Sequence, residues 1–279
     1  MSAGTLRPGA YQLTIVLLVV LGIFAGLVGA LSGTGGGIII TPMLALHFGV
    51  PIEQAIGTSL IAVITTSAAS SSVHLQRHTT DIRLGMTLEL ATSLGAATTA
   101  YLVGYINRTA LEVLFAAFLM YGAITIMRRG GKTEDEQDEF VPQASGNGLV
   151  IPDYEPKNVP LGLGASLVAG GLSGLLGIGG GPIKVPVMYI FMGIPLIVAT
   201  ATSNFMIGVT AAASASVYFR RGDVVVGLAA PMAVGVFLGS LAGARLAVRV
   251  HSKYVAILLV GIMLYLSLHM FVHIAGKFL

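Results

Sequence analysis

Two glycine-rich interruptions of apolar sequence are the first candidates for binding chemistry. Gly33-Thr-Gly-Gly-Gly37 and Gly177-Ile-Gly-Gly-Gly181 each break an apolar run, with prolines close behind. Each glycine costs about 1 kcal/mol in a helix relative to alanine, so each run should separate two helices. Irregular backbone within a bilayer must be buried in protein or line a cavity, and N–H groups at a helix start can bind an anion. The residues predicted to contact a ligand are Gly33, Gly35, Gly36, Gly37, Gly177, Gly179, Gly180 and Gly181; tight helix packing is the alternative.

Hydroxyl side chains form a second repeated element at a fixed distance from the two glycine runs. Thr58-Ser59 and Thr202-Ser203-Asn204 each lie in a segment that starts with proline. Hydroxyls near the bilayer midplane can donate to an oxyanion or join helices by interhelical hydrogen bonds. Both interpretations stay open from the sequence, and all five residues are candidate substrate ligands.

Ionisable residues within apolar runs are the third set of candidates. A charge near the bilayer centre costs about 2.5–3.5 kcal/mol on insertion scales, which makes each one a functional candidate. Lys184 follows the second glycine run, where it could attract an anion, and Ile40 is its counterpart in the first half. Glu89 and His74 are candidates for coupling, since a carboxylate can relay a proton and an imidazole titrates near neutral pH. A snorkelling lysine, an interfacial glutamate and a structural histidine are the alternatives.

The composition indicates that membrane-spanning helices position these groups. Of 279 residues, 55% are hydrophobic and 10% are charged, with a mean hydropathy of +0.88, whereas soluble domains are roughly 25% charged. This balance excludes soluble enzymes, nucleic-acid-binding proteins and disordered chains, and the lack of cysteine excludes disulfides and thiolate sites. The sequence predicts an all-α polytopic membrane protein with short or broken glycine-rich helices. Its expected helical segments are 11–31, 38–50, 53–74, 84–104, 109–127, 161–176, 183–193, 195–219, 224–247 and 253–275.

A polar stretch at 128–160 divides the chain into a first half, 1–127, and a second half, 161–279. Its acidic run and its Pro, Gly and Asn residues predict a linker that does not cross the membrane. The distribution of Lys and Arg around the segments places this linker on the cytoplasmic side. The first apolar run has a counterpart at 161–176, so we expect it to belong to the mature fold and not to a cleaved signal peptide.

An internal repeat relates the two halves at a spacing of 144 residues. Of the 35 positions from 26 to 60, 13 are identical to their counterparts at 170–204. A two-residue deletion then aligns Asp81–Gly85 with Asp223–Gly227. Arg77 with Asp81, and Arg220-Arg221 with Asp223, then occupy equivalent loops, as helix-end anchors and pairs or as a basic vestibule that attracts anions. Five segments in each half would insert the halves with opposite orientations, which is the inverted-repeat pattern of secondary transporters.

The motif GxGGG…P…G…A..TS, present in both halves, resembles the TauE/SafE family of membrane permeases, which export sulfite or organosulfur anions. The resemblance covers about 11–127 and 161–275. It implies two homologous helical halves, transport of small anions such as sulfite, sulfonates or sulfoacetate, and a substrate region at 33–37, 58–59, 177–181 and 202–203. The first half lacks a proline directly after its glycines, so the two sites should differ. We expect the second half and Lys184 to contribute more to substrate binding.

The leading expectation is a secondary transporter of small anions in the cytoplasmic membrane, working by alternating access around a midplane site between the halves. Its partners would be the anionic substrate, membrane lipid and a coupling ion, H⁺ or Na⁺, with no cofactor, metal or nucleic acid. The alternatives are a cation or neutral-solute carrier, a scaffold subunit, and an intramembrane serine protease using Ser59 or Ser203 with His74.

Overall fold

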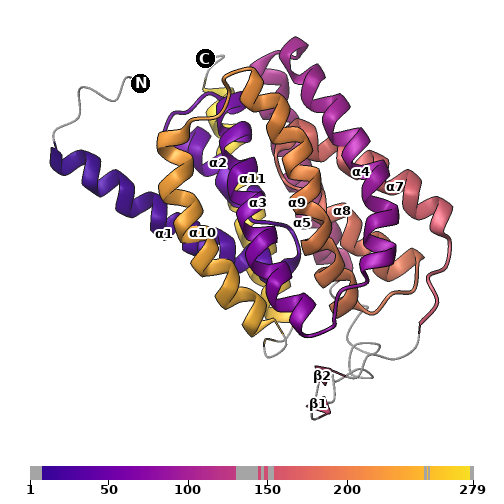
Figure 1. Ribbon diagram of the computed structural model, residues 1–279. Helices are drawn as coiled ribbons and strands as arrows, with labels where there is room; N and C mark the ends of the chain where they lie inside the picture. Colours follow the sequence, from indigo (N-terminus) through magenta and orange to yellow (C-terminus); the bar gives the residue numbers. More distant parts are fainter. Residues whose placement is uncertain are drawn as a thin grey trace.

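The computed structural model describes residues 8–129, 144–145, 148–149, 154–247, 250 and 252–276. Helices dominate this part of the chain (Figure 1). The first half contains α1 (Pro8–Ser32), α2 (Gly37–His47), α3 (Ile52–Gln76), α4 (Ile82–Leu102), the 3₁₀ turn η1 (Val103–Tyr105) and α5 (Arg108–Arg129). The second half contains α7 (Val159–Leu176), α8 (Gly181–Pro186), the π-helical turn η2 (Val187–Phe191), α9 (Leu196–Arg220), α10 (Val226–Leu246) and α11 (Ser252–Ala275). Two short antiparallel strands, β1 (Ala144–Ser145) and β2 (Gly148–Leu149), lie between the halves.

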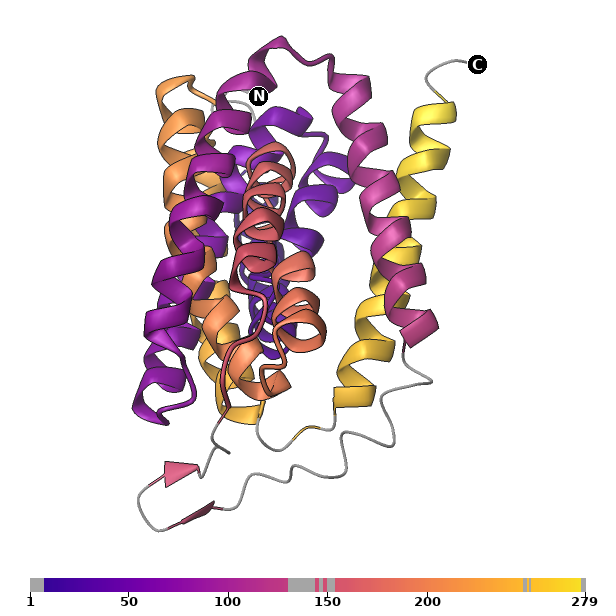
Figure 2. The same cartoon turned by 90° about the vertical axis from the view of Figure 1, so that its right-hand side faces the viewer.

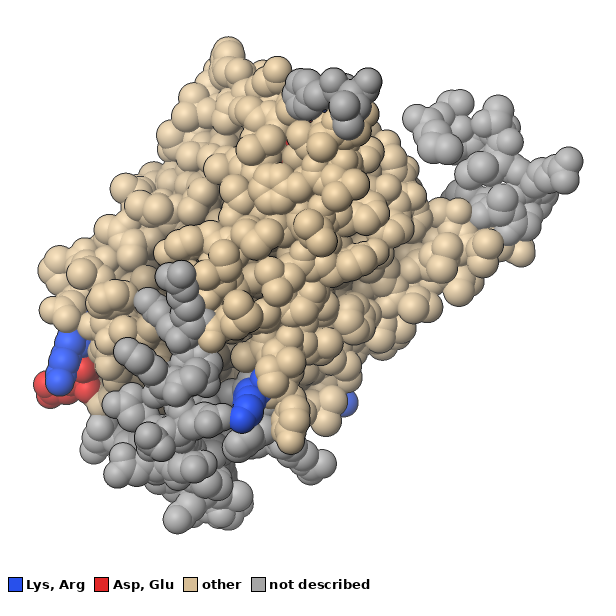
Figure 3. Space-filling view, turned by 180° about the vertical axis from the view of Figure 1, so that it is seen from behind, with Lys and Arg blue, Asp and Glu red and all other residues tan. Residues whose placement is uncertain are grey.

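The prediction of a polytopic all-helical fold is confirmed. Seven of the described helices are long and apolar enough to cross a membrane, and α2 and the α8–η2 segment are shorter apolar helices. Such helices satisfy their own backbone hydrogen bonds, as the bilayer interior requires. The face in Figure 3 is almost free of Lys, Arg, Asp and Glu, as expected for a surface in contact with lipid.

Glycine contacts hold two parallel helix pairs together, α1 with α10 and α4 with α7 (Figure 1). A Cβ atom added at Gly235 of α10 would meet the carbonyl of Val19. One added at Gly170 of α7 would meet the carbonyl of Thr92. Small residues let membrane helices approach this closely, so that dispersion contacts replace the hydrophobic effect that lipid cannot supply.

Two further helix pairs, α3 with α9 and α5 with α11, run antiparallel. Near the centre of the molecule, Gly57 of α3 packs against the carbonyl of Asp223, and ten residues further along α3 the Ser67 hydroxyl donates to the carbonyl of Asn204 in α9. On the outside, α5 packs against α11 (Figure 2), where the hydroxyl of Ser267 donates to the carbonyl of Ala116 at 2.8 Å. In both pairs the partners are counterparts in the sequence repeat.

The local backbone repeats at a spacing of 144 residues beyond the region of sequence identity. His78 and Gly222 both have positive φ, and Asp81 and Val225 are both N-caps, of α4 and α10. The expected two-residue deletion, which equated Asp81 with Asp223, is therefore wrong. The shared Asp-x-x-x-Gly pattern misled the alignment, because the turn depends on backbone conformation that His78 and Gly222 adopt without sharing a side chain. The inverted orientation of the halves and the boundaries of the linker stay predictions, and the acidic run at 134–139 lies outside the described residues.

Candidate functional site

The two glycine breaks meet each other. A Cβ atom added at Gly37 would collide with the carbonyl of Gly177, and one added at Gly181 would collide with the carbonyl of Gly33. Only residues without a side chain allow this approach, which joins the start of each short helix, α2 or α8, to the end of the long helix in the other half. The sequence prediction that each run separates two helices is confirmed.

The other two glycines of each break's Gly-Gly-Gly run are required by a left-handed backbone conformation. Gly35 and Gly36 have φ of 77°, and their counterparts Gly179 and Gly180 have φ of 75°. Residues with a Cβ rarely adopt this conformation. Gly36 and Gly180 are the N-caps of α2 and α8, so the same turn starts both short helices.

The serines of the hydroxyl pairs tie each half to the glycine break of the other. Ser59 Oγ lies 3.2 Å from the carbonyl oxygen of Gly177, and Ser203 Oγ donates to the carbonyl of Gly33 at 3.0 Å. Ser59 also lies within hydrogen-bond distance of Ile56 O and accepts from Thr41 Oγ1, both at 2.8 Å. Both serines are fully buried, so their hydroxyls link helices in this conformation.

The threonines of the pairs support the start of the following helix in the opposite half. Thr58 Oγ1 accepts the N–H of Val225, and Thr202 Oγ1 accepts the N–H of Asp81, both at 3.0 Å. Because these N–H groups lie at the N-caps of α10 and α4, each threonine satisfies a donor that the helix itself leaves free.

Asn204 has no polar counterpart in the first half, because the related residue is Leu60. Its Nδ2 donates to the carbonyl of Ala30 at 3.0 Å. Its buried Oδ1 has no hydrogen-bond partner among the described residues. A direct role of Asn204 and of the hydroxyl pairs in substrate binding remains a prediction.

Lys184 and Glu89 form a buried ion pair that joins the two halves. Lys184 Nζ lies 3.6 Å from Glu89 Oε2, and the two side chains are 1% and 7% exposed. Lys184 Nζ also donates to Thr210 Oγ1 at 3.2 Å. The hydroxyls of Thr210 and Ser93 donate to Glu89 Oε1 at 2.7 and 2.6 Å. The carboxylate therefore accepts two short hydrogen bonds at one oxygen, while its Oε2 faces the ammonium without one.

This charged cluster occupies only one of two positions that the repeat relates. Counterparts 144 residues away are Ile40 for Lys184 and Ala233 for Glu89. Thr66 is the counterpart of Thr210 and donates to its own helix, at the carbonyl of Ala62. The related position of the other half therefore carries no charged pair, and a difference in substrate binding between the two sites stays a prediction.

Ser93 and Thr210 were not candidates in the sequence analysis. Ser93 lies one helical turn after Glu89, a spacing that brings side chains together and could have identified it. Thr210 lies in the other half, and only the packing of α4 against α9 brings it to Glu89.

His74 is buried at the end of α3, where its Nδ1 lies 3.4 Å from Thr79 Oγ1. Its Nε2 lacks a hydrogen-bond partner among the described side chains. Within the described part of the chain, no hydrogen bond or ion pair joins it to Lys184 or Glu89. The three candidate ionisable residues therefore separate into a charged pair and an isolated histidine.

Arg77 and Arg221, at equivalent helix ends of the two halves, have different partners. Arg221 Nε lies 3.0 Å from Asp223 Oδ2, as expected for a helix-end pair, and burial raises the pKa of Asp223 while Arg221 opposes the shift. Arg77 instead donates to the carbonyl of Ala244 at 3.3 Å.

Asp81 has different partners from those expected. Its Oδ1 caps α4 at the N–H of Leu84, and its Oδ2 accepts from the hydroxyl of Tyr154 at 2.9 Å. Burial, and then the hydrogen bond to Asp81, raises the pKa of Tyr154 above its ordinary value.

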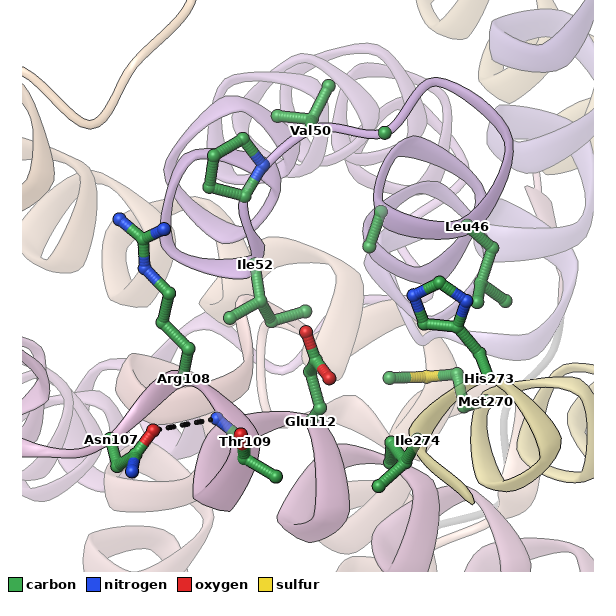
Figure 4. A pocket seen from close by; sticks show the side chains of 13 residues that line it. Leu46, Val50, Ile52, Asn107, Arg108, Thr109, Glu112, Met270, His273 and Ile274 are labelled. Carbon is green, nitrogen blue, oxygen red and sulfur yellow. Dashed lines mark hydrogen bonds between the residues drawn. The ribbon is translucent and has the colours of Figure 1, made fainter. Parts of the chain in front are cut away.

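A pocket in the described part of the chain lies away from the glycine breaks. Its volume is about 500 Å³, and it lies among the α2–α3 loop, the start of α5 and the end of α11. Figure 4 shows Glu112 and His273 directed into it and Arg108 directed away, and Arg108 forms an exposed ion pair with Glu53. A second, apolar groove of about 480 Å³ lies among α1, α2 and α11. Neither pocket reaches the glycine breaks, which are closely packed in this conformation.

Comparison with known proteins gives one family. A sequence model described as "Sulfite exporter TauE/SafE" matches residues 18–270. The chain is 28% identical over 255 residues to the probable membrane transporter protein YunE of Bacillus subtilis, covering 88% of this chain and 93% of YunE. It is 26% identical over 277 residues to a probable membrane transporter protein of Methanocaldococcus jannaschii, covering 93% and 96% of the two chains. No solved structure matches significantly.

Proposed function

Because this chain belongs to the sulfite exporter TauE/SafE family of membrane transporters, we propose that it carries small oxyanions, with sulfite and sulfonates such as sulfoacetate as the substrate class. The family and its relatives identify a transporter and not an enzyme.

The buried ammonium of Lys184 is the observation that carries this proposal. It lies at the second glycine break, on the short helix α8, and is enclosed within the molecule. A buried charge is costly unless it is paired, and here the pairing group is a carboxylate. A carboxylate and a sulfonate are both anionic oxygen ligands, so a site that holds one has the charge needed for the other.

The proposed mechanism is alternating access between two inverted halves around the meeting point of the glycine breaks. The hydrogen bonds from Ser59 to Gly177 and from Ser203 to Gly33 cross between the halves. A closed centre of this kind must open to one side at a time, so these bonds would break and re-form in each cycle. The site would then expose the glycine N–H groups, the hydroxyls and Asn204 to the substrate.

The proposed location is the cytoplasmic membrane, with the linker at 128–160 on the cytoplasmic side. H⁺ or Na⁺ remains the candidate coupling ion.

Ligand-dependent stabilisation of the purified protein tests the substrate class, because a ligand that binds the native state raises the unfolding temperature. The thermal midpoint would be measured with sulfite, sulfoacetate, taurine, sulfate and chloride for the wild type, Lys184→Met and Lys157→Met. Lys157 is exposed before α7 and is the matched control. We expect sulfite or a sulfonate to stabilise the wild type and the Lys157 variant but not the Lys184 variant.

Each variant is compared with its own ligand-free midpoint, so a loss of basal stability does not imitate a loss of binding. Uptake of the same anions into proteoliposomes then shows whether binding leads to transport. Stabilisation by Na⁺ alone, or equal stabilisation of the Lys184→Met variant by the anions, would overturn the proposal.

A further inference from the structure

The partner of Lys184 is part of the same chain, and this determines what an arriving anion must displace. Glu89 lies on α4 of the first half and Lys184 on α8 of the second. We infer that Glu89 is an internal anion that neutralises Lys184 in the absence of substrate and takes up a proton when a substrate anion replaces it. This inference rests on the proposed function of the Lys184 site.

Charge balance within the buried cluster supports the inference. The ammonium and the carboxylate together carry no net charge. Adding a monovalent anion alone would leave a net charge of −1 in a region shielded from water, which is costly. Adding the anion with one proton, bound at a Glu89 carboxylate oxygen, leaves the cluster neutral: the ammonium then pairs with the substrate, and Glu89 becomes a carboxylic acid.

The hydrogen-bonding groups around Glu89 suit both of its protonation states. A hydroxyl can donate one hydrogen bond and accept others. The hydroxyls of Ser93 and Thr210 now donate to Glu89 Oε1, and after rotation either of them can accept the proton of a neutral carboxyl group. Glu89 Oε2 has no hydrogen bond among the described residues and lies 3.6 Å from the ammonium, so it is the oxygen that loses its partner when the anion arrives.

No second charged side chain near the pair can take over this role among the described residues. α7 has no ionisable side chain, and α9 has only Tyr218 and Arg220, near its far end. Besides Lys184, the α8–η2 segment carries Tyr189. On α4 itself, the other titratable groups are Arg83 and Tyr101, both exposed.

The repeat fixes the number of protons. The related position in the other half contains Ile40 and Ala233, which cannot titrate. We therefore expect one proton to accompany each monovalent anion into the site.

Proton uptake during anion binding tests this inference. Methanesulfonate is a suitable probe, since it is monovalent and does not itself titrate near neutral pH. Calorimetric titration in buffers of different ionisation enthalpy counts the protons that the wild type takes up. Infrared difference spectra with and without methanesulfonate show whether a carboxylic acid C=O band appears. We expect one proton per anion, a new C=O band, and an affinity that falls about tenfold per pH unit over the range in which one proton is taken up.

Glu89→Gln and Glu155→Gln assign the band. Glutamine keeps the size of the side chain at position 89 and can still accept from Ser93 and Thr210, whereas Glu155 is exposed in the loop before α7. The band should disappear in Glu89→Gln and persist in Glu155→Gln. Anion binding by the wild type without proton uptake, or a band that persists in Glu89→Gln, overturns the inference and leaves the proposed function intact.

Two other outcomes are also decisive. If the Glu89 variant does not fold, the proton count of the wild type still determines the result. If sulfite and the sulfonates fail to bind the wild type at all, the proposed function itself fails.

Discussion

Separating Lys184 from Glu89 should destabilise the protein strongly, and removing both charges should restore most of the loss. The Glu89 side chain is 7% exposed, and Lys184→Met removes the one cation that pairs with its Oε2 among the described residues. Breaking a buried pair in this way costs about 3–5 kcal/mol. In Lys184→Met/Glu89→Gln no charge remains, and the amide oxygen at position 89 can still accept from Thr210 and Ser93. We expect the double variant to unfold within about 1 kcal/mol of the wild type, since uncharged replacements of buried pairs are often neutral.

The assay is reversible unfolding in mixed micelles by a denaturing detergent, with the thermal midpoint as a second readout. A loss of about 3–5 kcal/mol corresponds to a midpoint shift on the order of 10 °C. Lys157→Met is the control, because this lysine is exposed before α7. Equal stability of Lys184→Met and the wild type would refute the reasoning, as would a double variant no more stable than the single one.

Three further predictions concern the packing that surrounds the site. Gly181→Ala should lower the unfolding free energy by about 1–3 kcal/mol, as overpacking does, because its Cβ would collide with a carbonyl of the first glycine break; Gly164→Ala has open space, and a comparable loss there would contradict the explanation. Thr202→Val removes the acceptor of the Asp81 N–H and should cost about 1–3 kcal/mol in the same unfolding assay, so an unchanged stability would show that this bond does not support α4. Burial and the hydrogen bond to Asp81 raise the pKa of Tyr154, so this residue should stabilise the fold below about pH 10, the ordinary tyrosine value, and lose that contribution as the pH rises. Tyr154→Phe should therefore flatten the decline of stability at alkaline pH, and an identical decline in wild type and variant would argue against this role.

The sequence was sufficient to predict the helical segments and the positions where they break. Apolar runs long enough to span a bilayer have few other stable conformations, and the run from Gly33 to Gly37 cannot continue a helix without cost. Sequence identity was a weaker guide to the turns. Asp81 and Asp223 share a residue type but occupy different positions in their turns. Asp81 is the N-cap of α4, whereas the N-cap of α10 is Val225, whose N–H donates to Thr58 in the other half.

The pairing of Lys184 with Glu89 could not be predicted in the same way. The two residues are 95 positions apart and lie in different halves, and no periodicity in either segment indicates the other. Their contact depends on how α4, α8 and α9 pack, and many arrangements of apolar helices satisfy the same hydropathy pattern. The sequence could show that each charge was out of place in lipid, but not that each was the partner of the other.

The structure changes the meaning of the repeated motifs. Ser59 and Ser203 each lie within hydrogen-bond distance of a carbonyl in the glycine break of the opposite half, so both halves share this contact. The Lys184–Glu89 pair does not recur, and the architecture is built without it at Ile40 and Ala233. A feature that one of two equivalent positions lacks is not required for the fold at that position. The cost of burying two charges at the other position then needs a different reason, and a site that holds an anion supplies one.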